Sequence, residues 1–241
     1  MLGQLLEYSV TARPIAASLD FYRSVGFGEL AVGDLLSCPY AAVWDGAVSI
    51  GLHDAEFPAT TPTFVRTDLK MHTRALRRAG IKLEFSRFGD DDFHQAAFSD
   101  PNGLLVVLLE ARTFSPATWG SSSVTACGKF LELSVAAHSI EDSEEFWQTL
   151  GLSVVERGEA PQAWVRMSGN GLVLGLHQTA NFAPALSFRC SELEARIEYL
   201  QAKGQRTQHG APFAIGQMSA ATLHTPHGSP IYMFDKQLDN L

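Results

Sequence analysis

Hydrophobic and polar residues follow one order of strand and helix patterns along the first half of the chain. Residues 5–11 alternate as a strand does, and residues 15–26 carry apolar side chains at helical spacing up to Gly26, a residue that suits a helix end. Pro14 fits the first turn of that helix. Three further strands are predicted over 28–32, 41–45 and 47–53. This order defines a βαβββ module.

The next stretch repeats the module. A strand is predicted over 63–66, followed by a helix over 68–79 that ends at Gly80. The remaining strands are predicted over 82–86, 94–99 and 104–110. The residues Asp-Pro-Asn-Gly at 100–103 predict a turn between the last two strands.

The second half of the chain repeats the first. LEYSV at 6–10 matches LELSV at 131–135, and Glu7 and Glu132 stand 125 residues apart. Other matching pairs are Phe21-Tyr22 with Phe146-Trp147, Gly51-Leu52-His53 with Gly175-Leu176-His177, and DPNG at 100–103 with TPHG at 225–228. Helices are predicted over 140–150 and 192–203. We therefore expect a first domain at 1–112, a Ser-, Thr-, Gly- and Pro-rich linker at 113–128, and a second domain at 129–241.

Two phrases within this order carry a family resemblance: FYRSVGF at 21–27 and DPNGLLVVLLE at 100–110. With the module order, they resemble the vicinal oxygen chelate family, the glyoxalase, bleomycin-resistance and extradiol dioxygenase group. The resemblance covers nearly the whole chain, twice over. It implies an α+β fold in which four βαβββ modules form two glyoxalase-like half-barrel domains, each with a ligand cavity on its concave side. Since this fold hosts many activities, it does not define a substrate.

The first strand of each half carries a carboxylate on the side expected to face the cavity. The side chains expected to pack on the helix are Leu6, Tyr8 and Val10, and Leu131, Leu133 and Val135. Those expected to face the cavity are Leu5, Glu7, Ser9 and Thr11, and Glu132, Ser134 and Ala136. An inward carboxylate is costly unless it is hydrogen-bonded, hydrated or bound to a metal.

Two interpretations of Glu7 and Glu132 stay open: a hydrogen-bonded structural acid inherited by both copies, or an acid that contacts a ligand. An apolar cavity would raise the carboxyl pKa, so both are also candidate catalytic acids or bases. The predicted ligand-binding residues are Glu7, Ser9, Glu132, Ser134 and Tyr232.

The resemblance also implies where a metal would bind. The family's metal enzymes place His or Gln at the position of Glu7 and Glu132, and Glu late in the last strand of each module. The other matching positions are Thr61, Ala185, Val107 and Tyr232, with Ile50 and Leu174 near the remaining two. Each half thus offers one carboxylate where the family has three or four ligands. We expect a degenerate metal site and assign no metal ligand, while a divalent metal stays open as a cofactor.

Other side chains have both a functional and a structural interpretation. His53 and His177 are expected at a strand end or on the face opposite the cavity, and His224 and His227 in a turn. His94 is expected either to point into the first cavity or to be structural. The aromatic residues that line a cavity or form core are Trp44, Trp164, Phe188, Tyr232 and Phe234.

Composition narrows the partners. Of 241 residues, 46% are hydrophobic and 18% charged, and the net charge is −8 without a basic stripe, which disfavours nucleic acid and anionic membranes. Three dispersed cysteines, Cys38, Cys127 and Cys190, favour a reducing compartment, and the sequence has neither a signal-peptide pattern nor a long apolar span. We expect a cytoplasmic monomer or homodimer.

These patterns favour a protein that binds a small organic ligand in a concave cavity. The alternatives are a metal-dependent or acid–base lyase, isomerase or extradiol-type dioxygenase, and a non-catalytic interaction scaffold.

Overall fold

The computed structural model of the chain describes residues 2–31, 39–89, 93–111, 125–179 and 181–235. The first half contains β1 (Gln4–Thr11), α1 (Ile15–Ser24), β2 (Gly28–Leu30), β3 (Tyr40–Trp44), β4 (Ser49–His53), β5 (Thr61–Arg66), α2 (Leu69–Arg78), β6 (Leu83–Arg87), β7 (Gln95–Ser99) and β8 (Leu105–Glu110). Every helix and strand predicted for this half is present, with ends shifted by at most two residues. Pro14 is the N-cap of α1 and so precedes its first turn.

The second half has the same order of elements. It contains β9 (Lys129–Ala136), α3 (Ile140–Thr149), β10 (Ser153–Gly158), β11 (Trp164–Gly169), β12 (Leu172–His177), β13 (Ala185–Cys190), α4 (Leu193–Ala202), β14 (Thr207–His209), β15 (Ser219–Leu223) and β16 (Ile231–Asp235). Helix α3 is capped by Ser139, whose hydroxyl accepts a hydrogen bond from Asp142 N. The two predicted helices of this half are therefore present.

Each half forms one eight-stranded mixed sheet. The strand orders are β2-β3-β4-β1-β5-β8-β7-β6 and β10-β11-β12-β9-β13-β16-β15-β14. The first strands of the two modules in a half, β1 with β5 and β9 with β13, pair antiparallel at the centre of the sheet. This confirms the predicted fold class, an α+β arrangement of four βαβββ modules in two half-barrels.

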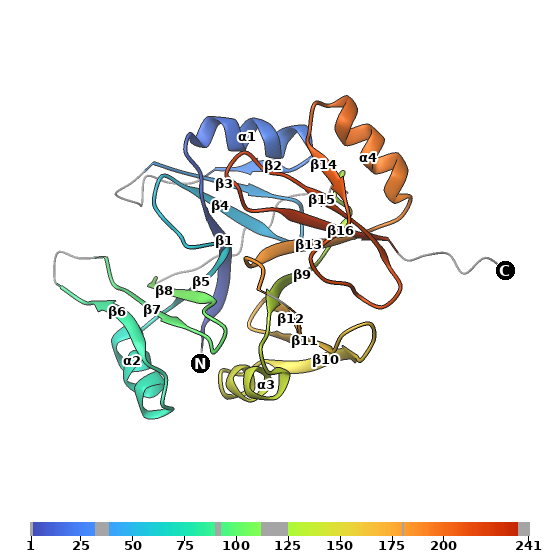
Figure 1. Cartoon of the computed structure of the whole chain (residues 1–241). Helices are drawn as coiled ribbons and strands as arrows, with labels where there is room; N and C mark the ends of the chain where they lie inside the picture. Colours follow the sequence, from blue (N-terminus) through green and yellow to red (C-terminus); the bar gives the residue numbers. More distant parts are fainter. Residues whose placement is uncertain (1, 32–38, 90–92, 112–124, 180, 236–241) are drawn as a thin grey trace.

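One face of each sheet carries the helices and a continuous hydrophobic core. Side chains from both halves belong to this one core, and rings meet across the halves, as Phe27 does with Phe188 at 6.2 Å between ring centres and Tyr8 with Phe130 at 5.6 Å. Figure 1 shows the consequence: α1 and α4 lie at one end of the molecule and α2 and α3 at the other. Each helix of the first half thus has a neighbour from the second.

The repeated motifs meet across the halves. Trp147 Nε1 of α3 donates a hydrogen bond of 3.2 Å to Asp100 Oδ2, in the DPNG turn. At the equivalent place, Tyr22 of α1 lies 3.0 Å from Nε2 of His227, in the TPHG turn. The aromatic helix motif of each half therefore binds the turn of the other.

A register shift changes part of the predicted pattern on the first strands. Between Leu5 and Glu7 the pairing of β1 with β5 slips by one residue, and the equivalent slip lies between Phe130 and Glu132 in β9. Leu5 accordingly packs against the helix-side core, and Leu131 packs with the cluster on the other face. The prediction that Leu5 faces the cavity and Leu131 the helix was wrong, because strict alternation ignores a bulge.

The proposed domain boundaries at 112/113 and 128/129 stay a prediction. Most of the 113–128 linker lies outside the described residues. In the described part of the chain, none of the helices is long and apolar enough to cross a membrane.

Candidate functional site

Glu7 lies in the middle of β1, and its carboxylate is held by hydrogen bonds from three side chains. Ser9 Oγ donates to Oε1 at 2.8 Å, and His53 Nε2, at the end of β4, lies 2.6 Å from the same oxygen. The hydroxyl of Tyr40, on β3, donates to Oε2. The Glu7 side chain is only 2% exposed and that of His53 10% exposed. In the described part of the chain, no Arg or Lys joins this network, so the charge of Glu7 is balanced there by hydrogen bonds and by His53 when it is protonated.

Glu132 has the same position in the second half but a different set of partners. Ser134 Oγ donates to Oε1 at 2.9 Å, and His177 Nε2 lies 2.6 Å from Oε1. The guanidinium Nε of Arg166, on β11, donates to Oε2 at 2.6 Å. The side chains of Glu132 and His177 are both 0% exposed. The carboxylate of Glu132 is therefore fully buried and paired with the guanidinium of Arg166.

Glycine on the neighbouring strand makes room for each carboxylate. A Cβ added to Gly51 would lie 2.0 Å from Oε1 of Glu7, and one added to Gly175 would lie 2.0 Å from Oε1 of Glu132. The repeated Gly-Leu-His motif thus has a physical reason: its glycine admits the acid, and its histidine binds it. The acid, glycine and histidine form one unit in each half.

His53 and His177 are the last residues of β4 and β12, in agreement with the expected strand ends. They lie on the concave face with the acids, so the alternative of the opposite face was wrong. In β4, Ile50 and Leu52 belong to the helix-side core, so Gly51 and His53 point to the concave face with Glu7. The expectation of the opposite face for His53 takes Ile50 and Leu52 as inward residues, which they are not. The error came from choosing the face of β4 without its pairing to β1.

The strand registers identify which residues are equivalent on the two concave faces. Ala42 pairs with Gly51, and Arg166 pairs with Gly175. Val107 pairs with Thr63, and Tyr232 pairs with the equivalent Ser187. The first concave face thus has alanine and valine at positions where the second has arginine and tyrosine.

Aromatic side chains fill the concave face of the second half. The cluster consists of Trp164, Phe213, Tyr232 and Phe234 with Ala185 and Ile215, and Phe182, Leu131, Ala211, Met218 and Ala220 pack against it. The ring of Phe213 lies 4.0 Å from that of His177, and Arg166 lies 5.2 Å from the ring of Trp164. These rings cover the Glu132 network. Of the predicted cavity aromatics, Trp164, Tyr232 and Phe234 belong here, whereas Phe188 belongs to the helix-side core.

The two networks differ in electrostatics. Burial raises the pKa of Glu132, but the hydrogen bond and charge of His177, together with Arg166, outweigh it, so the pKa lies below its ordinary value of 4.5. In the first half, burial and then the negative charge of Glu7 raise the pKa of Tyr40 far above its ordinary value, which keeps its hydroxyl protonated as a donor. Glu132 is thus stabilised as an anion within a complete ion pair.

The serines predicted to bind a ligand link the two central strands. Ser9 Oγ lies 2.7 Å from Thr63 Oγ1, and Ser134 Oγ lies 2.7 Å from Ser187 Oγ. All four hydroxyl groups are buried. These bonds hold the carboxylate and the first strand of the next module in one network.

The remaining histidines lie elsewhere. Nδ1 of His94 is 2.5 Å from Oε2 of Glu110, and its Nε2 is 3.3 Å from the carbonyl oxygen of Gly89. His227 is in its predicted turn, in contact with Tyr22, and its neighbour His224 is exposed.

The residues around each carboxylate do not fit the family's metal. Among the described residues, no group of three His, Cys, Asp or Glu side chains lies close enough to hold one ion. Glu132 already has a guanidinium on its second oxygen, and a divalent cation there would meet that positive charge. Around Glu7, one carboxylate and one imidazole fall short of the three ligands such a centre needs.

Comparison with solved structures gives the fold class. The 2,3-dioxygenase LapB from Pseudomonas sp. KL28 superposes with a TM-score of 0.62 at 16% identity, covering 98% of this chain and 94% of that one. A catechol 2,3-dioxygenase superposes with a TM-score of 0.60 at 15% identity, and the match covers 98% of this chain and 88% of that one. A variant of homoprotocatechuate 2,3-dioxygenase from Brevibacterium fuscum superposes with a TM-score of 0.65 at 11% identity, and the match covers 98% of this chain and 72% of that one. The chain thus has the two-domain vicinal oxygen chelate fold of these dioxygenases. No protein-family model and no curated protein matches the sequence.

Sequence reasoning missed Arg166, Tyr40 and the role of the histidines. The signal for His53 and His177 was present, since both follow Gly-Leu at matching positions. Trp164 is equivalent to Tyr40, and Ala42 is equivalent to Arg166. Neither donor is repeated in the other half, so the repeat could not point to them. Only the pairing of β3 with β4 and of β11 with β12 brings them to the acids.

Proposed function

We propose that the chain binds a small aromatic molecule on the concave face of its first half, with Glu7 and Tyr40 as polar anchors. The single observation that carries this proposal is the difference between the two halves at equivalent positions. At positions where the second concave face has Arg166 and Tyr232, the first has Ala42 and Val107. We infer that a ligand would take up the missing side-chain volume and would donate to Glu7 in place of the missing guanidinium.

The chemistry of the Glu7 network favours a ligand that donates a hydrogen bond. A carboxylate offers about four lone-pair sites, and the described contacts of Glu7 with Ser9, His53 and Tyr40 use three of them, two on Oε1 and one on Oε2. A ligand hydroxyl group can take the fourth, on Oε2 beside Tyr40. Rings of Tyr40 and Phe57 lie 4.7 Å and 5.1 Å from that of His53, which supports a flat ligand. A catechol has both properties, and one of the proteins with this fold is a catechol 2,3-dioxygenase.

In this proposal the second half is structural. Its aromatic cluster and its Glu132–Arg166 ion pair occupy the concave face, so we assign Glu132, Ser134 and Tyr232 to packing and not to ligand contact. The same observation supports a degenerate metal site in that half.

Calorimetric titration with catechol tests the proposal. Wild-type protein is expected to bind, and Tyr40→Phe and Glu7→Gln are expected to lower affinity by roughly tenfold or more, since each loses a hydrogen bond that involves a charge. Glu145→Gln, at an exposed position on α3, is the matched control and keeps wild-type affinity. Binding that is absent in the wild type, or equal in all four proteins, contradicts the proposal.

The second candidate function is catechol ring cleavage by a 2,3-dioxygenase-type enzyme. The observation that favours it is the likeness to such enzymes over 98% of this chain. The metal content of freshly purified protein, and product formation from catechol and oxygen after addition of ferrous ion, test it. Stoichiometric iron that is lost in Glu7→Gln, together with turnover, would establish the enzyme. Catechol binding with neither iron nor product supports a binding protein.

A further inference from the structure

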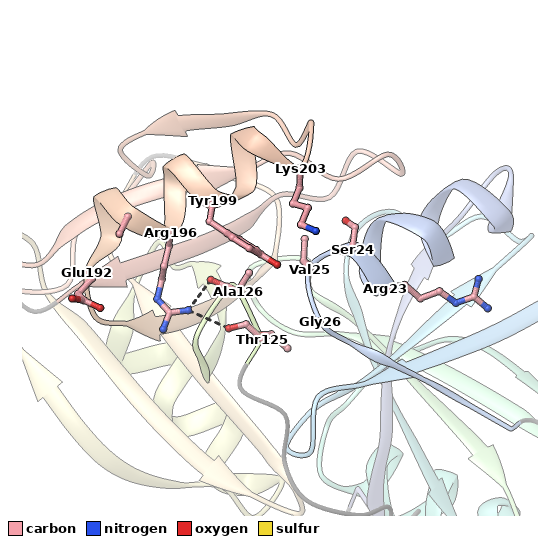
Figure 2. A pocket seen from close by; sticks show the side chains of 11 residues that line it. Arg23, Ser24, Val25, Gly26, Thr125, Ala126, Glu192, Arg196, Tyr199 and Lys203 are labelled. Atoms are coloured by element: carbon pink, nitrogen blue, oxygen red, sulfur yellow. Dashed lines mark hydrogen bonds between the residues drawn. The ribbon is translucent and has the colours of Figure 1, made fainter.

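A groove between the two halves has its own polar groups and lies apart from both concave faces. Its volume is about 580 Å³, within the range of small-molecule sites. It is lined by Arg23, Ser24, Val25 and Gly26 from the end of α1, by Thr125 and Ala126, and by Glu192, Ala195, Arg196, Tyr199 and Lys203 around α4. Figure 2 shows that α4 forms one wall and the end of α1 the opposite one. Only a chain with both halves has this groove.

Hydrogen bonds fix the walls, and one of them joins the two halves. Arg196 Nη1 donates to the carbonyl oxygens of Thr125 at 3.2 Å and Ala126 at 2.9 Å. Gln205 Nε2, just after α4, donates to Ser24 Oγ at 3.0 Å. The groove is therefore preformed, which lowers the entropic cost of binding.

Tyr199 and Lys203 project from consecutive turns of α4 into this groove, as Figure 2 shows. Tyr199 is 50% exposed, so part of its ring is open to a ligand in the groove. The Lys203 ammonium lies 5.7 Å from the centre of the Tyr199 ring, and among the described residues no carboxylate lies within 4.0 Å of it. One side of the groove thus offers an uncompensated cation beside an aromatic ring.

The charge of the lining is the opposite of that of the whole chain. Three basic side chains and one acidic side chain line the groove, whereas the chain has a net charge of −8. Figure 2 shows the side chain of Arg23 directed away from the other lining residues, so Lys203 and Arg196 supply the local positive potential. Arg196 is already bound to carbonyl oxygens, which leaves Lys203 as the group that a ligand would meet.

We propose that this groove is a second binding site, for a small aromatic carboxylate whose anionic group pairs with Lys203 and whose ring packs on Tyr199. A carboxylate matches the ammonium, and a flat ring matches an exposed tyrosine face. The site is independent of Glu7 and of the proposed catechol site.

Titration with benzoate, followed by amide chemical shifts in nuclear magnetic resonance, tests this proposal. Benzoate is expected to shift resonances of residues 23–26 and 195–203, and Lys203→Gln and Tyr199→Ala are each expected to weaken binding about tenfold. Lys82→Gln, which removes an exposed lysine remote from the groove, keeps the wild-type affinity. Binding should weaken as salt is added, because the pair is exposed.

Two further probes, each with only one of the two binding groups of benzoate, separate the contribution of the anionic group from that of the ring. Inorganic phosphate lacks the ring and benzyl alcohol lacks the charge, so both are expected to bind more weakly than benzoate. Benzoate that causes no shifts at 23–26 and 195–203, or that binds Lys203→Gln as it binds the wild type, overturns the proposal.

Discussion

Arg166 Nε donates a hydrogen bond of 2.6 Å to Oε2 of Glu132, and both side chains are buried. At the equivalent position of the first half stands Ala42, and the partner of Glu7 Oε2 is the hydroxyl of Tyr40. One duplicated acid thus has a fixed cation in one copy and a neutral donor in the other. This divergence is the reason to expect different roles for the two halves.

Removal of Arg166 is expected to destabilise the protein strongly. Arg166→Met leaves the buried Glu132 carboxylate without its cation, at a cost of about 3–5 kcal/mol in the free energy of unfolding. Urea denaturation of the wild type and the variant measures this loss in the free energy of unfolding. Arg157→Met, which breaks an exposed pair with Glu144 at 3.4 Å, is the control and should cost no more than about 1 kcal/mol. Equal effects for the two variants would show that Arg166 is not part of a closed ion pair.

The two inward glycines are expected to tolerate no side chain. Gly51→Ala and Gly175→Ala each place a Cβ 2.0 Å from a carboxylate oxygen that its hydrogen bonds hold in place. A loss of about 1–3 kcal/mol in the free energy of unfolding is expected for each. Gly28→Ala is a suitable control, because the nearest atom to its added Cβ is 3.7 Å away. If Gly51→Ala were as stable as Gly28→Ala, Glu7 would not occupy the place described for it.

Contact between the halves is expected to depend on pH through His227. Burial lowers the pKa of this histidine from 6.5 to about 4. Between pH 6.5 and about 4, His227 binds a proton in the unfolded chain but stays neutral in the folded chain. The contribution of neutral His227 to the free energy of unfolding is therefore complete above pH 6.5 and is lost as the pH falls toward 4. The slope is at most about 1.4 kcal/mol per pH unit.

His227→Asn, which copies Asn102 of the first turn, should flatten this dependence. Denaturation of both proteins at several pH values between 4 and 7 measures the difference, with the titration of other groups common to both. An unchanged slope in the variant would mean that His227 is accessible to protons in the folded state.

The sequence allowed the fold to be predicted in detail because its signals are local or repeated. Alternation along 5–11, the Gly26 stop and the DPNG turn each fix an element without tertiary information, and the repeat confirms them. Glu7 and Glu132 could be singled out for the same reason. Leu5 and Leu131 were placed on the wrong faces, since a bulge is set by strand pairing and leaves no mark on a short alternating pattern.

The repeat marked His53 and His177, but their contacts with the acids, and the roles of Tyr40 and Arg166, could not be predicted, because these residues come from strands that the chain order does not bring next to β1 or β9. His53 is 46 residues from Glu7, and Arg166 is 34 residues from Glu132. Likewise, the binding of Trp147 to Asp100 depends on how the two sheets pack and not on either motif alone. These contacts are therefore set by the strand register and by the packing between the halves, which the sequence alone does not reveal.

The affinity of Ala42→Arg for catechol tests the central claim most directly. This substitution gives the first half the guanidinium that Arg166 gives the second, and it should both neutralise Glu7 and occupy the ligand's place. Ala47→Arg, which adds the same group at an exposed position, is the control. We predict that catechol binds the wild type and Ala47→Arg alike and that binding is lost in Ala42→Arg. Catechol binding of equal strength in Ala42→Arg and the wild type would contradict the account.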